Sequence, residues 1–258
     1  MAHTQLIDIP PMFEASHLLL LATIAAATFI QSLTGFGFGL IVVSILTVFN
    51  LLPLTATAFL ISALSIINSA ELAVRNRNHI QKVAARRILG AGLPFIVIGF
   101  LLLEWLSTSQ AGLLRTLLGI FILLATLSLL IKKQKQTDES GAFSFVVSGA
   151  LAGVLGGLYS TFGPPVVYQI YRQPWHIEQM KATLLCVFSI TSLIRLLIIP
   201  FGTWPAIDTL YVTITAVPVV LIFTKLARKA SPFINPTIIR RFSISLLAAS
   251  GLLLLLQH

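Results

Sequence analysis

Two glycine-rich breaks, Gln31-Ser-Leu-Thr-Gly-Phe-Gly-Phe-Gly-Leu40 and Gly157-Leu-Tyr-Ser-Thr-Phe-Gly-Pro-Pro-Val166, interrupt long apolar sequence. They lie at an offset of 126 positions, which places Phe36-Gly37 on Phe162-Gly163 without a gap. The same offset places Ala56-Thr57 on Ala182-Thr183. Interrupted hydrophobic segments at corresponding positions of two halves indicate the binding site of a transporter built from repeats.

The chain as a whole is too apolar for a soluble protein. Of its 258 residues, 57% are hydrophobic and 10% are charged, whereas soluble domains carry about 25% charged residues. The mean hydropathy is +0.96. We therefore predict an all-α polytopic membrane protein, with residues 1–258 forming a single membrane domain.

The N-terminal region and the single cysteine narrow the class further. Met1–Ser16 contains no Lys or Arg and no evident cleavage site, so we expect the first hydrophobic segment to be retained. Cys186 has no second cysteine to pair with, which argues against a thiol-redox enzyme and favours a small packing residue. The net charge of +9 is expected to come from cytoplasmic loops that face anionic lipid, and no nucleic-acid partner is predicted.

Apolar segments define the expected membrane spans, since a spanning helix needs about 20 residues. Six segments are long enough: 54–73, 88–106, 112–131, 182–200, 207–224 and 240–256. Four others form two pairs, each split by a glycine-rich break: 18–33 with 36–49, and 142–158 with 164–171. The sequence leaves open whether the limbs of each pair cross the membrane fully or turn back midway.

Basic residues predict which connections face the cytoplasm. Placing loops 75–87, 132–141, 172–181 and 225–241 inside accounts for 15 of the 17 Lys and Arg residues. Both split pairs must then be hairpins, and both termini are predicted outside. Under the 126-residue offset the charge bias changes sides, because basic loop 75–87 falls on 201–213, which has no Lys or Arg. This pattern predicts inverted repeats, each with one hairpin and three crossings, over about 17–135 and 142–258.

The second break has the composition of a helix start. Ser160 and Thr161 are N-cap candidates, and Pro164-Pro165 suits a first helical turn. Proline disfavours helix in the preceding residue, which predicts that the chain breaks at Gly163. Free N–H groups and the positive end of the helix dipole would then form an anion site at the apex.

Close helix packing is the alternative explanation for small residues in membrane helices. We favour packing for Gly149 and Gly153, which form a small-residue stripe with Gly157. We favour a binding site for Gly35–Gly39 and Ser160–Pro165, because these segments lie at hairpin apices in matching repeat positions.

Polar residues within apolar segments often line a pathway, although interhelical bonding explains most of them. Gln31 and Tyr159 flank the breaks and are site candidates, whereas Asn68 and Gln169 are expected to form interhelical bonds. Arg195 lies about one and a half turns from the end of its span, where it faces the bundle or snorkels, and binding or attraction of an anion is as plausible as a structural role.

An acidic residue near the end of span 54–73 raises a further alternative. Glu71 is followed four residues later by Arg75, so an i,i+4 ion pair is expected there rather than a proton-coupling site. No strong carboxylate site for a coupling ion is visible within the predicted spans.

These motifs resemble those of the sulfite exporter TauE/SafE family. The resemblance rests on Thr34-Gly-Phe-Gly-Phe-Gly39 and Ser160-Thr-Phe-Gly-Pro-Pro165, and it extends over most of the chain. It implies a secondary transporter of the bacterial inner membrane that moves small anions such as sulfite, sulfoacetate or thiosulfate. The predicted substrate-binding residues are Gln31, Thr34, Gly35, Phe36, Gly37, Gly39, Tyr159, Ser160, Thr161, Phe162, Gly163, Pro164 and Arg195.

Three function classes remain at this point. A transporter with alternating access around the breaks is favoured, with a small anionic solute and the lipid bilayer as partners and with no cofactor or metal. An intramembrane enzyme is disfavoured, because all five histidines lie in predicted loops, termini or segment ends. A channel or a membrane scaffold stays open, as do the coupling ion, the transport direction and the oligomeric state.

Overall fold

The computed structural model describes residues 15–130, 136–202, 204–234 and 236–256, and within these ranges all regular structure is helical. The α-helices of the described part are α1 (Ala15–Thr34), α2 (Phe38–Val48), α3 (Leu54–Arg75), α4 (Lys82–Ser109), α5 (Ala111–Leu130), α6 (Ala142–Tyr159), α7 (Gly163–Tyr171), α8 (Ile177–Ile198), α9 (Ile207–Ala230) and α10 (Pro236–Leu256). Short 3-10 helices occupy Arg77–His79, Ile199–Phe201 and Ser231–Phe233.

Seven described helices are long and apolar enough to cross a membrane: α1, α3, α4, α5, α6, α8 and α9. Five of the six predicted long spans are among them. The sixth, 240–256, lies in α10, whose described apolar part, Ile244–Leu256, is shorter than a full span. The protein is therefore an all-α polytopic membrane protein, as its composition predicted.

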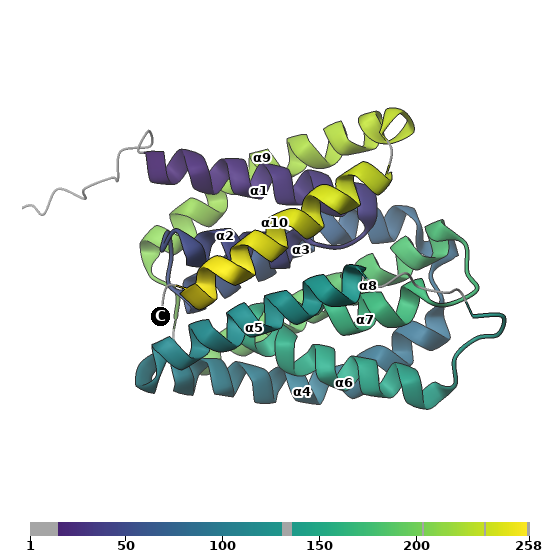
Figure 1. Ribbon diagram of the computed structural model, residues 1–258, viewed down its shortest axis with the longest axis horizontal. Coiled ribbons are helices and arrows are strands. Elements are labelled where there is room, and N and C mark those ends of the chain that lie inside the picture. The colour runs from purple at the N-terminus through teal and green to yellow at the C-terminus, as the bar shows by residue number, and fades with distance from the viewer. Residues whose placement is uncertain (1–14, 131–135, 203, 235, 257–258) are drawn as a thin grey trace, which may run out of the picture.

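Each split pair consists of one long limb and one short limb. Helices α1 and α6 have 20 and 18 residues, whereas α2 and α7 have only 11 and 9. At about 1.5 Å per residue, α2 and α7 reach about half-way across a hydrocarbon core of about 30 Å. Figure 1 shows that α2 turns back alongside α1 after the first break.

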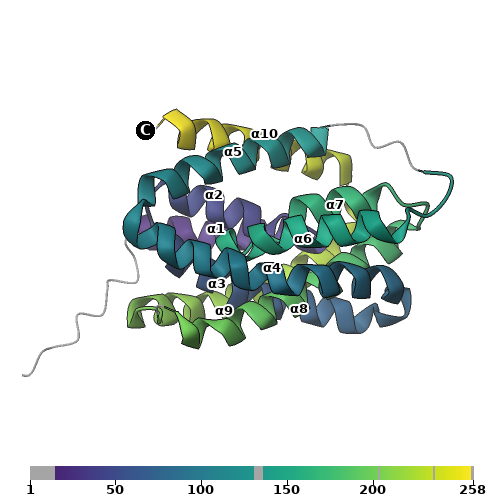
Figure 2. The same cartoon turned by 90° about the horizontal axis from the view of Figure 1, so that it is seen from below.

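Two connections that contain basic residues lie at one end of the bundle, and two connections without Lys or Arg lie at the other (Figures 1 and 2). Basic connections 76–81 and 172–176 lie at one end. Connections 49–53 and 199–206 lie at the other, together with the starting end of α1 and the finishing end of α10. Lys132, Lys133 and Lys135 of the predicted basic loop 132–141 lie outside the described residues.

A seam of glycines joins α4 to α6. A Cβ atom at Gly149, Gly153 or Gly157 would collide with backbone carbonyl oxygens of α4. Small residues let two membrane helices approach this closely, so close packing is confirmed for Gly149 and Gly153, and Gly157 packs in the same way. The seam fixes α6, and with it the start of the second break.

Candidate functional site

The two breaks line one cavity of about 40 Å³, which we call the central cavity. Nine of the predicted site residues line it: Gln31, Phe36, Gly37, Gly39, Ser160, Thr161, Phe162, Gly163 and Pro164. The first half supplies four of these residues and the second half supplies five. Segments more than 100 residues apart in the sequence therefore share one site.

The first break is held open by left-handed glycines. Gly35 has φ +83° and Gly37 has φ +107°, values that residues with a side chain rarely adopt. The Gln31 side chain supports the turn: its Oε1 accepts the Phe38 N–H at 3.1 Å, and its Nε2 donates to Ser69 Oγ at 2.8 Å. Gln31 thus caps the first N–H of α2 and ties the break to α3.

The second break lies three residues earlier than predicted. Helix α6 ends at Tyr159, Ser160 takes the left-handed conformation with φ 54°, and Gly163 is already the first residue of α7. Ser160 can hold this conformation because its Oγ donates to the Ala58 carbonyl at 2.7 Å and contacts Ser62 Oγ at 2.6 Å. The prediction that the chain breaks at Gly163 is therefore wrong.

The predicted N-caps of α7 are also wrong. Phe162 occupies the N-cap position, and no side chain caps the helix. Pro164-Pro165 does occupy the first turn, as predicted, and since proline has no N–H, Gly163 is the residue of that turn with an N–H to offer. The Thr161 hydroxyl is left buried without a hydrogen-bond partner, and its side chain lines the cavity.

The two breaks pack directly on each other. A Cβ atom at Gly39 would lie 2.8 Å from Thr161 Cγ2 and 3.1 Å from the Ser160 carbonyl oxygen. Only glycine permits this approach, so any movement of one break must shift the other. The starts of α2 and α7 both border the cavity, which brings two positive helix ends to one small volume.

Four predicted site residues do not line the central cavity. Thr34 stabilises the first turn by donating to the Phe36 carbonyl at 2.8 Å, and Gly35 packs against Lys181. Tyr159 points away, since its hydroxyl donates to the Leu114 carbonyl at 3.1 Å. Arg195 faces the bundle interior, 3% exposed, one layer beyond the cavity.

The cavity also has lining residues that the motifs did not reveal. These are Leu40, Ser65, Val167, Phe188, Thr191 and Ser192. Ser65 and Thr191 are related by the same 126-residue offset as the two breaks. A search for hydroxyl groups at matching positions of α3 and α8 would have found them.

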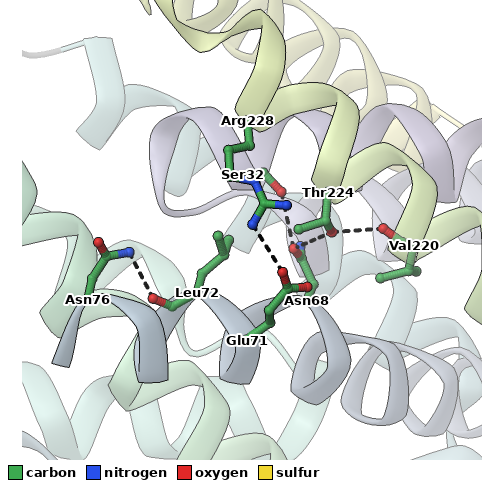
Figure 3. A network of polar contacts seen from close by, with 8 residues as sticks. All are labelled: Ser32, Asn68, Glu71, Leu72, Asn76, Val220, Thr224 and Arg228. Atoms are coloured by element: carbon green, nitrogen blue, oxygen red, sulfur yellow. Dashed lines mark hydrogen bonds and ion pairs between the residues drawn. The ribbon is translucent and has the colours of Figure 1, made fainter.

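A second polar cluster ties α3 to α1 and α9 (Figure 3). Asn68 Oδ1 accepts hydrogen bonds from the hydroxyls of Ser32 and Thr224, both at 3.1 Å, which confirms interhelical bonding for this residue. Glu71 pairs with Arg228 at 3.2 Å, so the expected pair with Arg75 is wrong. Gln169 differs, because its Nε2 has no partner and it borders an apolar groove beside α5.

The central cavity is lined by uncharged residues, several of which are polar. It presents hydroxyls, an amide and backbone from two helix starts, without a carboxylate, histidine or cysteine among its lining residues. Elsewhere in the described ranges, no three His, Cys, Asp or Glu side chains gather into a possible metal site.

Comparisons with known proteins agree with this architecture. A sequence model described as "Sulfite exporter TauE/SafE" matches residues 19–254. A protein of Cupriavidus necator named "Probable sulfite/organosulfonate exporter TauE" is 36% identical over 239 residues, which cover 91% of this chain and 92% of that protein. No solved structure matches the chain.

Proposed function

This chain belongs to the sulfite exporter TauE/SafE family, and from that premise we propose that it exports sulfite or a small organosulfonate by alternating access around its two breaks. It is a multi-pass membrane transporter rather than an intramembrane enzyme. The finer assignment draws on the name of the C. necator relative for the substrate and on the central cavity for the mechanism.

One observation carries the proposal: both breaks enclose the same cavity, and the buried Thr161 hydroxyl there lacks a protein partner. A buried polar group without a partner costs free energy, and for Thr161, which lines the cavity, we propose a bound anion as that partner. Sulfite and sulfonates present several oxygen acceptors on one sulfur. The hydroxyls of Ser65, Thr161 and Ser192, together with two positive helix ends, would satisfy those oxygens.

Equivalent contacts in the two halves support inverted repeats. The pairs Phe36/Phe162, Gly37/Gly163 and Ser65/Thr191 are each related by the 126-residue offset, and all six residues line the cavity. Under the same offset α1 corresponds to α6, α3 to α8 and α4 to α9. The contacts between helices correspond as well: α1 packs on α9 as α6 packs on α4, and α3 packs on α9 as α8 packs on α4. The cavity therefore lies where a pseudo-twofold axis would pass, which is the expected place for an alternating-access site.

The distribution of charge sets the proposed orientation in the bacterial inner membrane. The end of the bundle with connections 76–81 and 172–176 faces the cytoplasm, because basic residues are retained on that side. Connections 49–53 and 199–206, with both chain ends, face outward. Export then carries the anion from the basic end to the opposite end.

Replacing Thr161 with valine tests the site itself. Val keeps the shape of Thr and removes only the hydroxyl, so the unliganded protein should be as stable as wild type or more stable. Sulfite binding should weaken about tenfold or more, because hydrogen bonds to charged groups contribute about 1.5–3 kcal/mol. Titration calorimetry on purified protein measures the Kd, and tryptophan fluorescence during heating measures the stability.

Thr57→Val is the matched control. The Thr57 hydroxyl is equally buried and also lacks a partner, but Thr57 does not line the central cavity. Its replacement should leave the sulfite Kd unchanged. An unchanged Kd in the Thr161→Val variant as well would remove the central cavity as the substrate site.

A further inference from the structure

A second cavity opens toward the proposed outer end of the bundle, and it leads inward to Arg195. This cavity, which we call the vestibule, measures about 350 Å³ and is walled by the facing ends of α3, α4, α8 and α9. Its lining includes Phe59, Phe100, Glu104, Arg195, Trp204 and Asp208. It is far larger than the central cavity and could admit a hydrated small anion.

A small polar gap connects the vestibule to the central cavity. The gap measures only about 10 Å³ and is lined by Arg195 together with Ser62, Ser160, Thr191 and Ser192. Arg195 is shared with the vestibule, and Ser160, Thr191 and Ser192 are shared with the central cavity. The gap therefore shares lining residues with both the vestibule and the central cavity, and it is too narrow for a sulfur oxyanion.

Arg195 closes this gap by holding the backbone of the second break. Its Nε and Nη2 donate to the Gly157 carbonyl at 3.2 and 3.1 Å, and Nη1 lies 3.5 Å from Ser62 Oγ. Two carboxylates, those of Glu104 and Asp208, line the vestibule together with Arg195, and Glu104 interacts electrostatically with the Arg195 guanidinium. The printed hydrogen-bond acceptors of the guanidinium are a backbone carbonyl and a hydroxyl, and its planar fork also matches the paired oxygens of an oxyanion.

The equivalent contact in the first half is uncharged. Gly157 and Arg195 correspond under the 126-residue offset to Gln31 and Ser69, and these two are also bonded, Gln31 Nε2 to Ser69 Oγ at 2.8 Å. The same helix–helix contact therefore uses an amide and a hydroxyl in one half and a guanidinium on a carbonyl in the other. Of these two equivalent contacts, only the one beside the vestibule, formed by Arg195, contains a positive charge.

We propose that the vestibule is an anion route and that Arg195 is its charge-selective gate. In the closed state its guanidinium binds the Gly157 carbonyl, and a passing sulfite or sulfonate takes over those N–H donors and releases the second break. This inference rests on the proposed carrier function, and it adds the side of passage and the gating residue.

Thiol labelling with charged reagents tests the route. A Ser192→Cys variant in a Cys186→Ser background is exposed from outside to 2-sulfonatoethyl methanethiosulfonate, an impermeant sulfonate, or to its trimethylammonium analogue. The sulfonate should react about tenfold faster than the cation or more, and sulfoacetate, which unlike sulfite does not react with the reagent, should slow it. With Arg195→Gln the preference should fall toward unity, and Arg195→Lys, which keeps the charge, should retain it.

Three positions supply the controls. Trp204→Cys at the vestibule rim should react from outside without protection by sulfoacetate, and Asn78→Cys in a basic connection should react only after permeabilisation. Ser69→Cys, at the position equivalent to Arg195, is as buried as the gate and should not react from outside.

The outcomes separate this inference from the proposed function. If Trp204→Cys is labelled but Ser192→Cys is not, or if charge preference is unchanged by Arg195→Gln, the gate is wrong even when sulfite binding is normal. Should Arg195→Gln fail to fold, an absence of protection by sulfoacetate at Ser192→Cys overturns the route equally. Charge-selective labelling in a protein that does not bind sulfite would instead overturn the proposed substrate and leave the route standing.

Discussion

Gly39→Ala should reduce sulfite flux about tenfold or more, because the added methyl group drives the two breaks apart. The new Cβ would lie 2.8 Å from Thr161 Cγ2, a distance that real Cβ contacts do not show. Overpacking of this kind typically costs about 1–3 kcal/mol, and here the strain falls on the substrate site rather than on a distant core. Flux is measured as sulfite uptake into liposomes that contain equal amounts of inserted protein.

A second substitution shows whether that contact is the cause. Thr161→Ser removes Cγ2 and keeps the hydroxyl that we assign to the substrate. In the double variant Gly39→Ala/Thr161→Ser, the nearest remaining neighbour of the new methyl is the Ser160 carbonyl oxygen at 3.1 Å. Flux should recover in part. Equal losses in the single and double variants would show that the two breaks do not act through this contact.

Gly92→Leu should destabilise the protein strongly, whereas Gly90→Leu should not. A Cβ at Gly92 would lie 2.5 Å from Phe162 Cζ and 2.9 Å from the Gly149 carbonyl oxygen, while one at Gly90 would meet no atom within 4 Å. Both substitutions gain about 1 kcal/mol of helix propensity. We therefore expect Gly92→Leu to be less stable than Gly90→Leu by at least about 1–3 kcal/mol.

The thermal unfolding midpoint in detergent, followed by tryptophan fluorescence, compares the two variants directly. They change the same residue type in the same helix two positions apart, so the bulk hydrophobicity of α4 is equal in both. Similar midpoints would contradict the close α4–α6 seam and, with it, the placement of the second break.

The spans and both breaks could be predicted because their signals are local in the sequence. Apolar runs of about 20 residues predict the spanning helices, and the two glycine clusters, 126 positions apart, predict where helices are interrupted. The stripe of Gly149 and Gly153 is equally local, since its four-residue spacing puts both glycines on one helix face. These parts of the prediction depend on no knowledge of which helices are neighbours.

The position of the second break depended on a tertiary contact and was predicted wrongly. Ser160 adopts a left-handed conformation, which serine seldom does, because Ala58 and Ser62 on α3 bond its hydroxyl. Gly163, the residue that the sequence favoured, needs no unusual backbone angle. Nothing near Ser160 in the sequence indicates that α3, about 100 residues earlier, supplies these partners.

Side-chain direction explains the other differences at the site. Tyr159 is the last residue of α6 and turns toward Leu114, whereas Ser160, in the left-handed conformation after the helix, lines the cavity. Glu71 pairs with Arg228 on α9 rather than with Arg75 on its own helix. This pair could be predicted only by knowing that α9 packs beside α3. Arg195 follows Thr191 by four residues on one helix face, so its place beside the cavity could have been anticipated.

Counterflow of sulfite in liposomes tests the central claim, that this protein is a carrier with one site between two breaks. Purified protein is reconstituted, and uptake of labelled sulfite is measured against unlabelled sulfite, sulfoacetate, thiosulfate or acetate inside. We predict saturable uptake that internal sulfite or sulfoacetate accelerates and that acetate does not. Uptake that rises linearly with concentration and ignores the internal anion would show a channel, and an absence of uptake for every sulfur anion would contradict the account.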